Sequence, residues 1–254
     1  MSEIRLPREV RLVSLSSNSL ERLVPDHLSP ADVTGRETLE LHLERYRFAA
    51  RHARAGRLLD IACGVGYGTR LLRDESQQVN FALGVDLCEE SVDYARERYG
   101  CDGVEYRVGD AERFQDPEGF DTIVCLETVE HLPSPAGLLD NLVSLLRPTG
   151  VLVASVPTTP SVDVNPHHLQ DFTEKSFRHL FAQRPLAECG CLRQVQPFGV
   201  TGILRRSEAR LEELRPKLLR YYATHPGAAL RRLASTVRYG FVNRYLTIAW
   251  QRCT

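Results

Sequence analysis

The sequence has no long apolar run and no excess of charge of either sign. No stretch approaches the roughly 20 consecutive apolar residues that a membrane-spanning helix needs. The 32 basic and 33 acidic side chains give a formal net charge of −1, so the protein lacks a general attraction to nucleic acid or anionic membranes. Residues 1–11 lack the apolar core of a secretory signal. We therefore predict a cytoplasmic protein that binds neither nucleic acid nor membrane.

A cysteine framework is also missing. The seven cysteines are odd in number and irregularly spaced, which argues against a set of disulfides. Cys189 and Cys191 form a Cys-Gly-Cys run, but no second Cys/His pair follows at the spacing of a zinc site. A chain of 254 residues can bury enough surface to fold without disulfides. The sequence predicts neither a disulfide scaffold nor a metal site.

The chain divides into an irregular N-terminal arm and one larger domain. Residues 1–36 contain several prolines and serines, which is typical of an arm or lid, and residues 37–254 form the predicted domain. Thr38–Ala53 has apolar residues at helical spacing. These features predict an arm that precedes a first helix.

From Arg57 onward, short apolar runs alternate with amphipathic segments. This pattern indicates βαβ units and a parallel sheet, and hence an α/β fold. We expect strands at Arg57–Ala62, Ala82–Asp86, Val104–Val108, Phe120–Leu126, Gly150–Val156, Leu186–Phe198 and Phe241–Trp250. We expect helices at Thr69–Glu75, Glu89–Tyr99, Pro135–Leu146 and Thr173–Gln183. Thr173 is the expected N-cap of the last of these helices, and Pro148 marks the end of the helix Pro135–Leu146.

A glycine-rich turn follows the first expected strand, in the run Asp60–Gly68. Its spacing is Gly-x-Gly-x-Gly, which differs from the Gly-x-Gly-x-x-Gly of dinucleotide sites and disfavours an NAD-dependent oxidoreductase. Asp86 closes the second strand and can accept hydrogen bonds from both hydroxyls of a ribose. Asp110 follows the third strand, where an acceptor can bind the amine of an adenine. The fourth strand leads into Glu127–Leu132, which ends in Glu-His-Leu.

This ordered set of motifs resembles the class I S-adenosylmethionine-dependent methyltransferases, particularly the methyltransferase type 11/12 group. The resemblance covers about residues 38–200. It implies a Rossmann-like, seven-stranded, mostly parallel sheet with an antiparallel last strand and helices on both faces. It also implies S-adenosylmethionine as cofactor. The cofactor contacts that we expect are His42, Arg45, Tyr46, Asp60, Ala62, Gly64, Gly66, Gly68, Asp86, Leu87, Asp110, Ala111, Glu112, Leu126 and Glu127.

Three of these residues, His42, Arg45 and Tyr46, share one face of the first expected helix. The helix is similar to one in bacterial methyltransferases that act on sugars and surface polysaccharides. Arginine suits the methionine carboxylate of the cofactor. The alternative is that this face is solvated or packed in the core.

Methyl transfer to a hydroxyl is helped by a general base, and histidine is the natural candidate. His131 follows the fourth strand, and His167 and His168 follow the fifth, so all three are expected at the carboxyl edge of the sheet. His168 matches the histidine that the family carries after its fifth strand. The alternative is that these histidines order their loops. Glu130 beside His131 could contribute to a metal site, although we predict none.

An insert at about residues 200–240 precedes the last strand. Its segment from about Glu208 to Arg238 is expected to be helical and is rich in arginine and tyrosine. It forms either a solvated basic face or a cover that contacts an anionic group of the acceptor. We predict O-methylation of a small hydroxylated molecule, such as a sugar, nucleotide-sugar or natural-product intermediate. N- or C-methylation, or cofactor binding without turnover, remain alternatives, and a homodimer is a further expectation.

Overall fold

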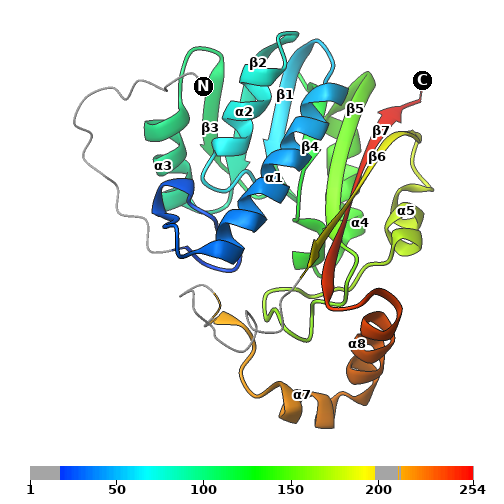
Figure 1. Ribbon diagram of the computed structural model, residues 1–254. Helices are drawn as coiled ribbons and strands as arrows, with labels where there is room; N and C mark the ends of the chain where they lie inside the picture. The colour runs from blue at the N-terminus through cyan, green and yellow to red at the C-terminus, as the bar shows by residue number, and fades with distance from the viewer. Residues whose placement is uncertain (1–17, 198–210, 212, 254) are drawn as a thin grey trace.

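The computed structural model describes residues 18–197, 211 and 213–253 (Figure 1). Its centre is a seven-stranded sheet in the order β3-β2-β1-β4-β5-β7-β6. The strands are β1 (Gly56–Ile61), β2 (Val79–Asp86), β3 (Val104–Val108), β4 (Phe120–Cys125), β5 (Leu146–Pro157), β6 (Leu186–Pro197) and β7 (Val242–Arg252).

Strand β7 lies between β5 and β6 and is antiparallel to both, whereas the pairs among β1 to β5 are all parallel. The strand order reverses at β1, which pairs with β2 on one side and β4 on the other. Ligands bind at such a switch point, beyond the carboxyl ends of the strands. The seven-stranded fold predicted from the sequence is confirmed.

Helices cover both faces of this sheet (Figure 1). One core cluster lies under α1, α2 and α3, and the other lies under α4 and α5. Among the described residues, no helix combines the length and the apolar character that crossing a membrane would require. The helices are η1 (Pro25–His27), α1 (Val33–His52), α2 (Tyr67–Glu75), α3 (Glu89–Tyr99), η2 (Val129–His131), α4 (Pro135–Leu145), α5 (Glu174–Phe181), α7 (Leu218–Thr224) and α8 (Pro226–Tyr239).

The expected boundaries differ most from the structure at the starts of β5 and α1. Strand β5 begins at Leu146, before Pro148. Its pairing with β4 skips residues, since Phe120 pairs with Leu146 and Thr122 pairs with Val151. This irregularity leaves Pro148 without a ladder partner, so its missing N–H costs the sheet nothing. Helix α1 begins at Val33, inside the segment assigned to the arm.

The helix expected at about Glu208–Arg238 is not continuous. Its described part forms α7 and α8, and Pro226 occupies the first turn of α8. A proline lacks the N–H needed to continue α7 but fits the start of a new helix. Residues 208–210 and 212, and Phe198 at the expected end of β6, lie outside the described residues.

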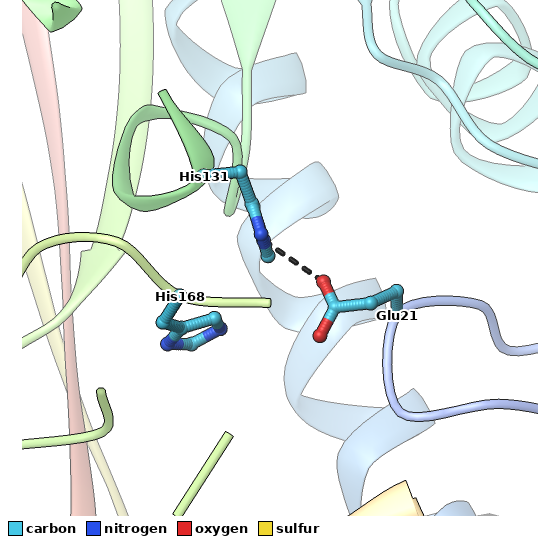
Figure 2. A group of neighbouring side chains, drawn as sticks. All are labelled: Glu21, His131 and His168. Carbon is cyan, nitrogen blue, oxygen red and sulfur yellow. Dashed lines mark ion pairs between the residues drawn. The ribbon is translucent and has the colours of Figure 1, made fainter. Parts of the chain in front are cut away.

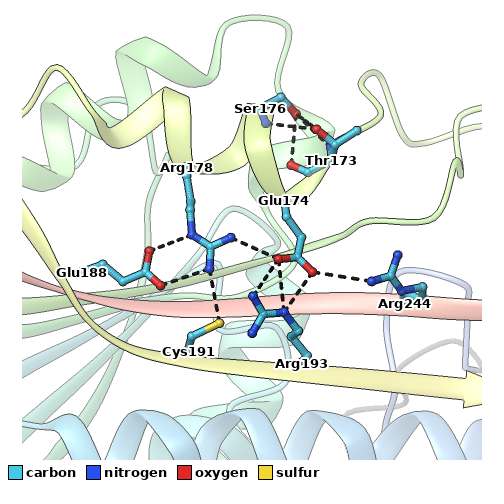
Figure 3. Close-up of polar contacts among 8 residues, drawn as sticks. All are labelled: Thr173, Glu174, Ser176, Arg178, Glu188, Cys191, Arg193 and Arg244. Carbon is cyan, nitrogen blue, oxygen red and sulfur yellow. Dashed lines mark hydrogen bonds and ion pairs between the residues drawn. The ribbon is translucent and has the colours of Figure 1, made fainter.

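Helix α5 is fixed by its cap and by a network of charges (Figure 3). Thr173 accepts a hydrogen bond from the N–H of Ser176 at 3.0 Å, which confirms the predicted N-cap. Glu174 accepts a hydrogen bond from Arg193 of β6 at 2.9 Å and lies 3.5 Å from Arg244 of β7. These contacts tie α5 to the antiparallel edge of the sheet.

Aromatic packing fills the space beneath α5. Phe181 stacks on Trp250 of β7 with ring centroids 3.7 Å apart. Phe177 meets both rings edge-on, at 5.2 Å from Phe181 and 5.6 Å from Trp250. All three side chains are buried, so their contacts with each other replace contacts with water.

Removing one of these rings should destabilise the whole domain. We expect Phe181→Ala to lower the free energy of unfolding by about 3–5 kcal/mol, because it removes a buried ring and leaves a cavity. Urea denaturation followed by circular dichroism measures the change. Leu219→Ala on α7 is the control, because that side chain is 87% exposed and its loss should cost less than about 0.5 kcal/mol.

Candidate functional site

A cavity of about 900 Å³ opens beyond the carboxyl ends of β1, β2, β4 and β5. Its walls come from the arm, from α1, from the loops after these strands and from the α7–α8 segment. Figure 1 shows the described part of the arm, from residue 18, and α7–α8 beyond the same edge of the sheet. The predicted cofactor contacts that line the cavity are His42, Tyr46, Ala62, Gly64, Asp86, Leu87, Asp110, Ala111, Leu126 and Glu127.

The turn after β1 packs closely against side chains of neighbouring elements. Gly66 adopts a φ of 87° as the N-cap of α2, and a Cβ there would lie 2.5 Å from Ala95 and 2.7 Å from the ring of Tyr106. A Cβ on Gly68 would lie 1.9 Å from the ring of Tyr46. Both positions therefore require glycine. These two glycines shape the turn, and the backbone around Gly64 faces the cavity.

Asp60 lies beneath this turn, and the described cavity lining does not include it. It accepts a hydrogen bond from the hydroxyl of Thr69 at 2.7 Å. Burial raises the pKa of Asp60 to about 7, against the hydrogen bonds from Thr69 and Tyr46 that lower it. The sequence predicted Asp60 as a cofactor contact, whereas its contacts are those of a group that holds the turn to α1 and α2.

Two acids border the cavity at the ends of β2 and β3. The carboxylate of Asp86 accepts the N–H groups of Gly64 at 2.8 Å and Cys88 at 2.9 Å, which fixes its orientation. Each of its oxygens keeps a further lone pair for a ligand hydroxyl. Asp110 accepts the N–H of Glu112 at 3.0 Å. The described lining includes Asp110 but not Glu112, which was also predicted to contact the cofactor.

Arg45 is fully buried behind the cavity and is not among its described lining residues. Its Nη1 donates to Gln194 at 3.2 Å and lies 3.9 Å from a carboxylate oxygen of Glu127. Its guanidinium covers the ring of Tyr245. Arg45 was expected to hold the methionine carboxylate, but in these contacts it braces Glu127.

Glu127 itself is held in a strained conformation at the cavity wall. Its φ is 48°, in the left-handed region that costs a non-glycine residue energy. The Ser155 hydroxyl accepts the N–H of Glu127 at 3.0 Å and donates to its carboxylate at 2.6 Å. Contacts with Ser155 and Arg45 therefore fix both the backbone and the side chain of Glu127.

Three titratable side chains converge at the other end of the cavity (Figure 2). The Nε2 of His131, in η2, lies 2.9 Å from a carboxylate oxygen of Glu21 in the arm. His168, from the loop after β5, packs edge-on against His131 with ring centroids 4.8 Å apart. The other oxygen of Glu21 accepts a hydrogen bond from Asn165 at 2.7 Å.

Burial and mutual contacts give Glu21, His131 and His168 different pKa values. Burial alone would lower the pKa of His131, but the hydrogen bond with Glu21 and the charge of Glu130 raise it to about 9. The same contact brings the pKa of Glu21 down to about 2, although burial opposes it. Burial and the charge of His131 lower the pKa of His168 to about 4. At neutral pH, His131 and Glu21 form an ion pair beside a neutral His168.

The third predicted histidine differs from these two. His167 is exposed and is absent from the described cavity lining, although its carbonyl accepts a hydrogen bond from Nδ1 of His131. Sequence reasoning missed Glu21, since one acid in an irregular arm carries no signal of its distant contacts. It also passed over Glu130 as a lining residue. Glu130 is fully buried, and neither carboxylate oxygen has a hydrogen-bond partner among the described residues.

The α7–α8 segment is anchored over the cavity by one buried acid. Asp163 accepts hydrogen bonds from Arg232 at 2.6 Å and from the hydroxyl of Tyr222 at 2.6 Å. Arg215 donates to the carbonyl of the same residue at 3.1 Å. Two arginines that were expected to meet either solvent or an anionic acceptor are therefore occupied within the protein. The apolar side chains that line this part of the cavity are Leu20, Leu23, Leu132, Val164, Leu211, Leu214, Leu218, Phe241 and Val242.

Known proteins that resemble the chain include several methyltransferases. Residues 59–154 match the family described as "Methyltransferase domain". A Mycolicibacterium smegmatis protein named as an S-adenosylmethionine-dependent methyltransferase is 30% identical over 61% of this chain and 66% of its own length. The ubiquinone biosynthesis O-methyltransferase of Leptothrix cholodnii is 33% identical over 41% of this chain and 46% of its own length. The chain thus spans just under two thirds of the first relative and less than half of the second.

A solved structure extends the likeness over most of the chain. The N-methyltransferase NodS from Bradyrhizobium japonicum, in complex with S-adenosyl-L-homocysteine, has a TM-score of 0.57 at 16% identity. The match covers 84% of this chain and 86% of NodS. At this identity the likeness concerns the fold.

Asp86 should carry much of the affinity for the cofactor. We expect Asp86→Ala to weaken binding of S-adenosylhomocysteine about 10- to 100-fold, because hydrogen bonds to a charged acceptor contribute about 1.5–3 kcal/mol. Isothermal titration calorimetry measures the affinity, and thermal unfolding checks that the turn at Gly64 survives. Asp93→Ala on α3, outside the described cavity lining, is the control. An unchanged affinity for Asp86→Ala would refute this assignment.

Proposed function

Because the chain belongs to the class I S-adenosylmethionine-dependent methyltransferases, we propose that it methylates a hydroxyl group of a small molecule. The observation that carries this proposal is the group of polar side chains at the far end of the cavity. His131, His168 and Glu21 can hold and orient a hydroxyl there. Several curated relatives are named for O-methylation, which agrees with such an acceptor.

In this reaction the protein mainly positions the cofactor and the acceptor, and it forms no covalent bond with either. The acceptor oxygen attacks the sulfonium methyl in line, the O–C bond forms, and the C–S pair of electrons returns to sulfur. The acceptor hydroxyl loses its proton, whereas the thioether leaves without one. Asp86 and Asp110 are suited to hold the nucleoside, so that the methyl group is directed toward the histidine end of the cavity.

The walls around the acceptor end favour a molecule with an apolar body. Leu211, Leu214 and Leu218 line this region, and Arg232 is already paired with Asp163. A sugar or nucleotide-sugar would bring some of its many hydroxyls or phosphates against these three leucines, which cannot hydrogen-bond them. We therefore propose a hydroxylated ring or chain in place of the sugar that the first helix suggested.

A second candidate is N-methylation, because the structural relative NodS is an N-methyltransferase. An amine acceptor can react without a group that removes a proton beforehand, so the histidine end would matter little. C-methylation and binding without turnover have no observation that favours them over O-methylation. The cytoplasmic location and the homodimer stay predictions from the sequence.

His168 separates these alternatives. We expect His168→Ala to lower kcat for a phenolic acceptor by about 10²–10⁴-fold, the usual contribution of a group that assists proton transfer. The affinity for S-adenosylhomocysteine should stay within about twofold, since the ring faces the acceptor end. The measurement is methyl transfer from labelled cofactor to matched phenols and anilines. His179→Ala, an exposed histidine on α5, is the control.

Faster methylation of the anilines, together with an unchanged rate for His168→Ala, would show that the N-methyltransferase alternative is right.

A further inference from the structure

We propose that Glu21, His131 and His168 bind a divalent transition metal ion of the zinc class at the acceptor end of the cavity. Each side chain offers one ligand atom, and the three atoms lie within 4.8 Å of one another. They come from the arm, from η2 and from the loop after β5, and Figure 2 shows them turned toward a common point. The sequence, which separates these residues widely, predicted no metal.

Both imidazoles are oriented as metal ligands usually are. Nδ1 of His131 is bonded to the carbonyl of His167 at 3.2 Å, so it carries the proton and leaves Nε2 for a ligand. Nδ1 of His168 lies 2.6 Å from the hydroxyl of Ser161, which again leaves Nε2. Metal-binding histidines typically use their second nitrogen in this way. The rings are thus held in place before any ion arrives.

The carboxylate completes a suitable set of ligands. One oxygen of Glu21 is fixed by Asn165 at 2.7 Å, and the other lies 2.9 Å from Nε2 of His131. A cation between these two atoms would take the place of the proton that they now share. Two imidazoles and one carboxylate suit zinc and its neighbours, and they leave a coordination position open. All three residues line the cavity, so that position faces the acceptor.

Glu130 is a second observation that points to a cation at this site. It lines the cavity, its side chain is fully buried, and neither carboxylate oxygen has a hydrogen-bond partner among the described residues. It precedes His131 directly in the chain. An unpaired buried carboxyl group is costly, and a cation held by His131 would offset that cost through its charge.

The inference rests on the proposed function and deepens it. A hydroxyl oxygen in the open position would lose its proton to water more readily, because the ion stabilises the oxyanion. The oxyanion then attacks the sulfonium methyl, the C–S bond breaks, and the products are the methyl ether and S-adenosylhomocysteine. The ion is neither oxidised nor reduced.

Cobalt(II) provides a test that does not depend on activity. The full chain is treated with chelator, titrated with Co²⁺ and followed by its visible d–d absorption, with Zn²⁺ competition and calorimetry in parallel. We expect one ion per chain and the spectrum of a site with nitrogen and oxygen ligands. Glu21→Gln and His168→Ala should each weaken binding at least about 100-fold, since even residues behind the ligands usually contribute about 10–100-fold.

His167→Ala is the matched control, because it removes the adjacent exposed imidazole but keeps the carbonyl that orients His131. It should bind Co²⁺ like the unchanged protein. Circular dichroism and the affinity for S-adenosylhomocysteine verify that each variant is folded.

The metal site is overturned if the intact chain takes up no Co²⁺, or if Glu21→Gln and His168→Ala bind it as tightly as His167→Ala does. Methylation of phenols by chelator-treated protein at the full rate would also overturn it and leave the proposed function standing. Metal uptake by one site, without methylation of any hydroxyl, would support the site and refute the proposed O-methylation.

Discussion

The direction of β7 determines where the parts of this molecule that face the acceptor can lie. Strand β7 is antiparallel to β5 and β6, so the chain between β6 and β7 must begin and end beyond the carboxyl edge of the sheet. The loops after β1, β2, β4 and β5 meet at that same edge. Helices α7 and α8 are therefore placed over the cavity by topology, and their contacts with Asp163 fix the exact position. The two ends of the cavity that we propose for the cofactor and the acceptor are built differently: the first from short turns after strands, the second largely from the N-terminal arm and the insert.

The end of the cavity that we propose for the cofactor could be predicted from the sequence because its geometry is local. A strand, a turn with glycines at fixed spacing and a helix are adjacent in the chain, and acids that end successive parallel strands must reach the same edge. Hence Gly64, Asp86 and Asp110 line the cavity as expected. Arg45 is not among the described lining residues, since a helical face can pack against the cavity or against the layer behind it. Which side it meets depends on Gln194 of β6, 149 residues later, and on Tyr245 of β7, still further along the chain.

The acceptor end could be predicted only in part. His131 and His168 follow strands, so their arrival at the edge was predictable, but their pairing with Glu21 depends on how the arm folds back. Nothing in the spacing of residues 18–24 indicates that contact. The basic character of the insert was also misleading as a guide to ligands. Arg215 and Arg232 are charged groups that the fold itself uses, because a buried acid such as Asp163 needs donors around it.

Asp163 connects the insert with the polar group formed by Glu21, His131 and His168. It lies in the segment between Ser161, which contacts His168, and Asn165, which contacts Glu21. Arg232 and Tyr222 of the insert both donate hydrogen bonds to the carboxylate of Asp163. A displacement of the insert that keeps these hydrogen bonds would also displace Asp163, and with it the contacts of Ser161 with His168 and of Asn165 with Glu21. The side chains that hold the insert are thus linked through Asp163 to the contacts that orient His168 and Glu21.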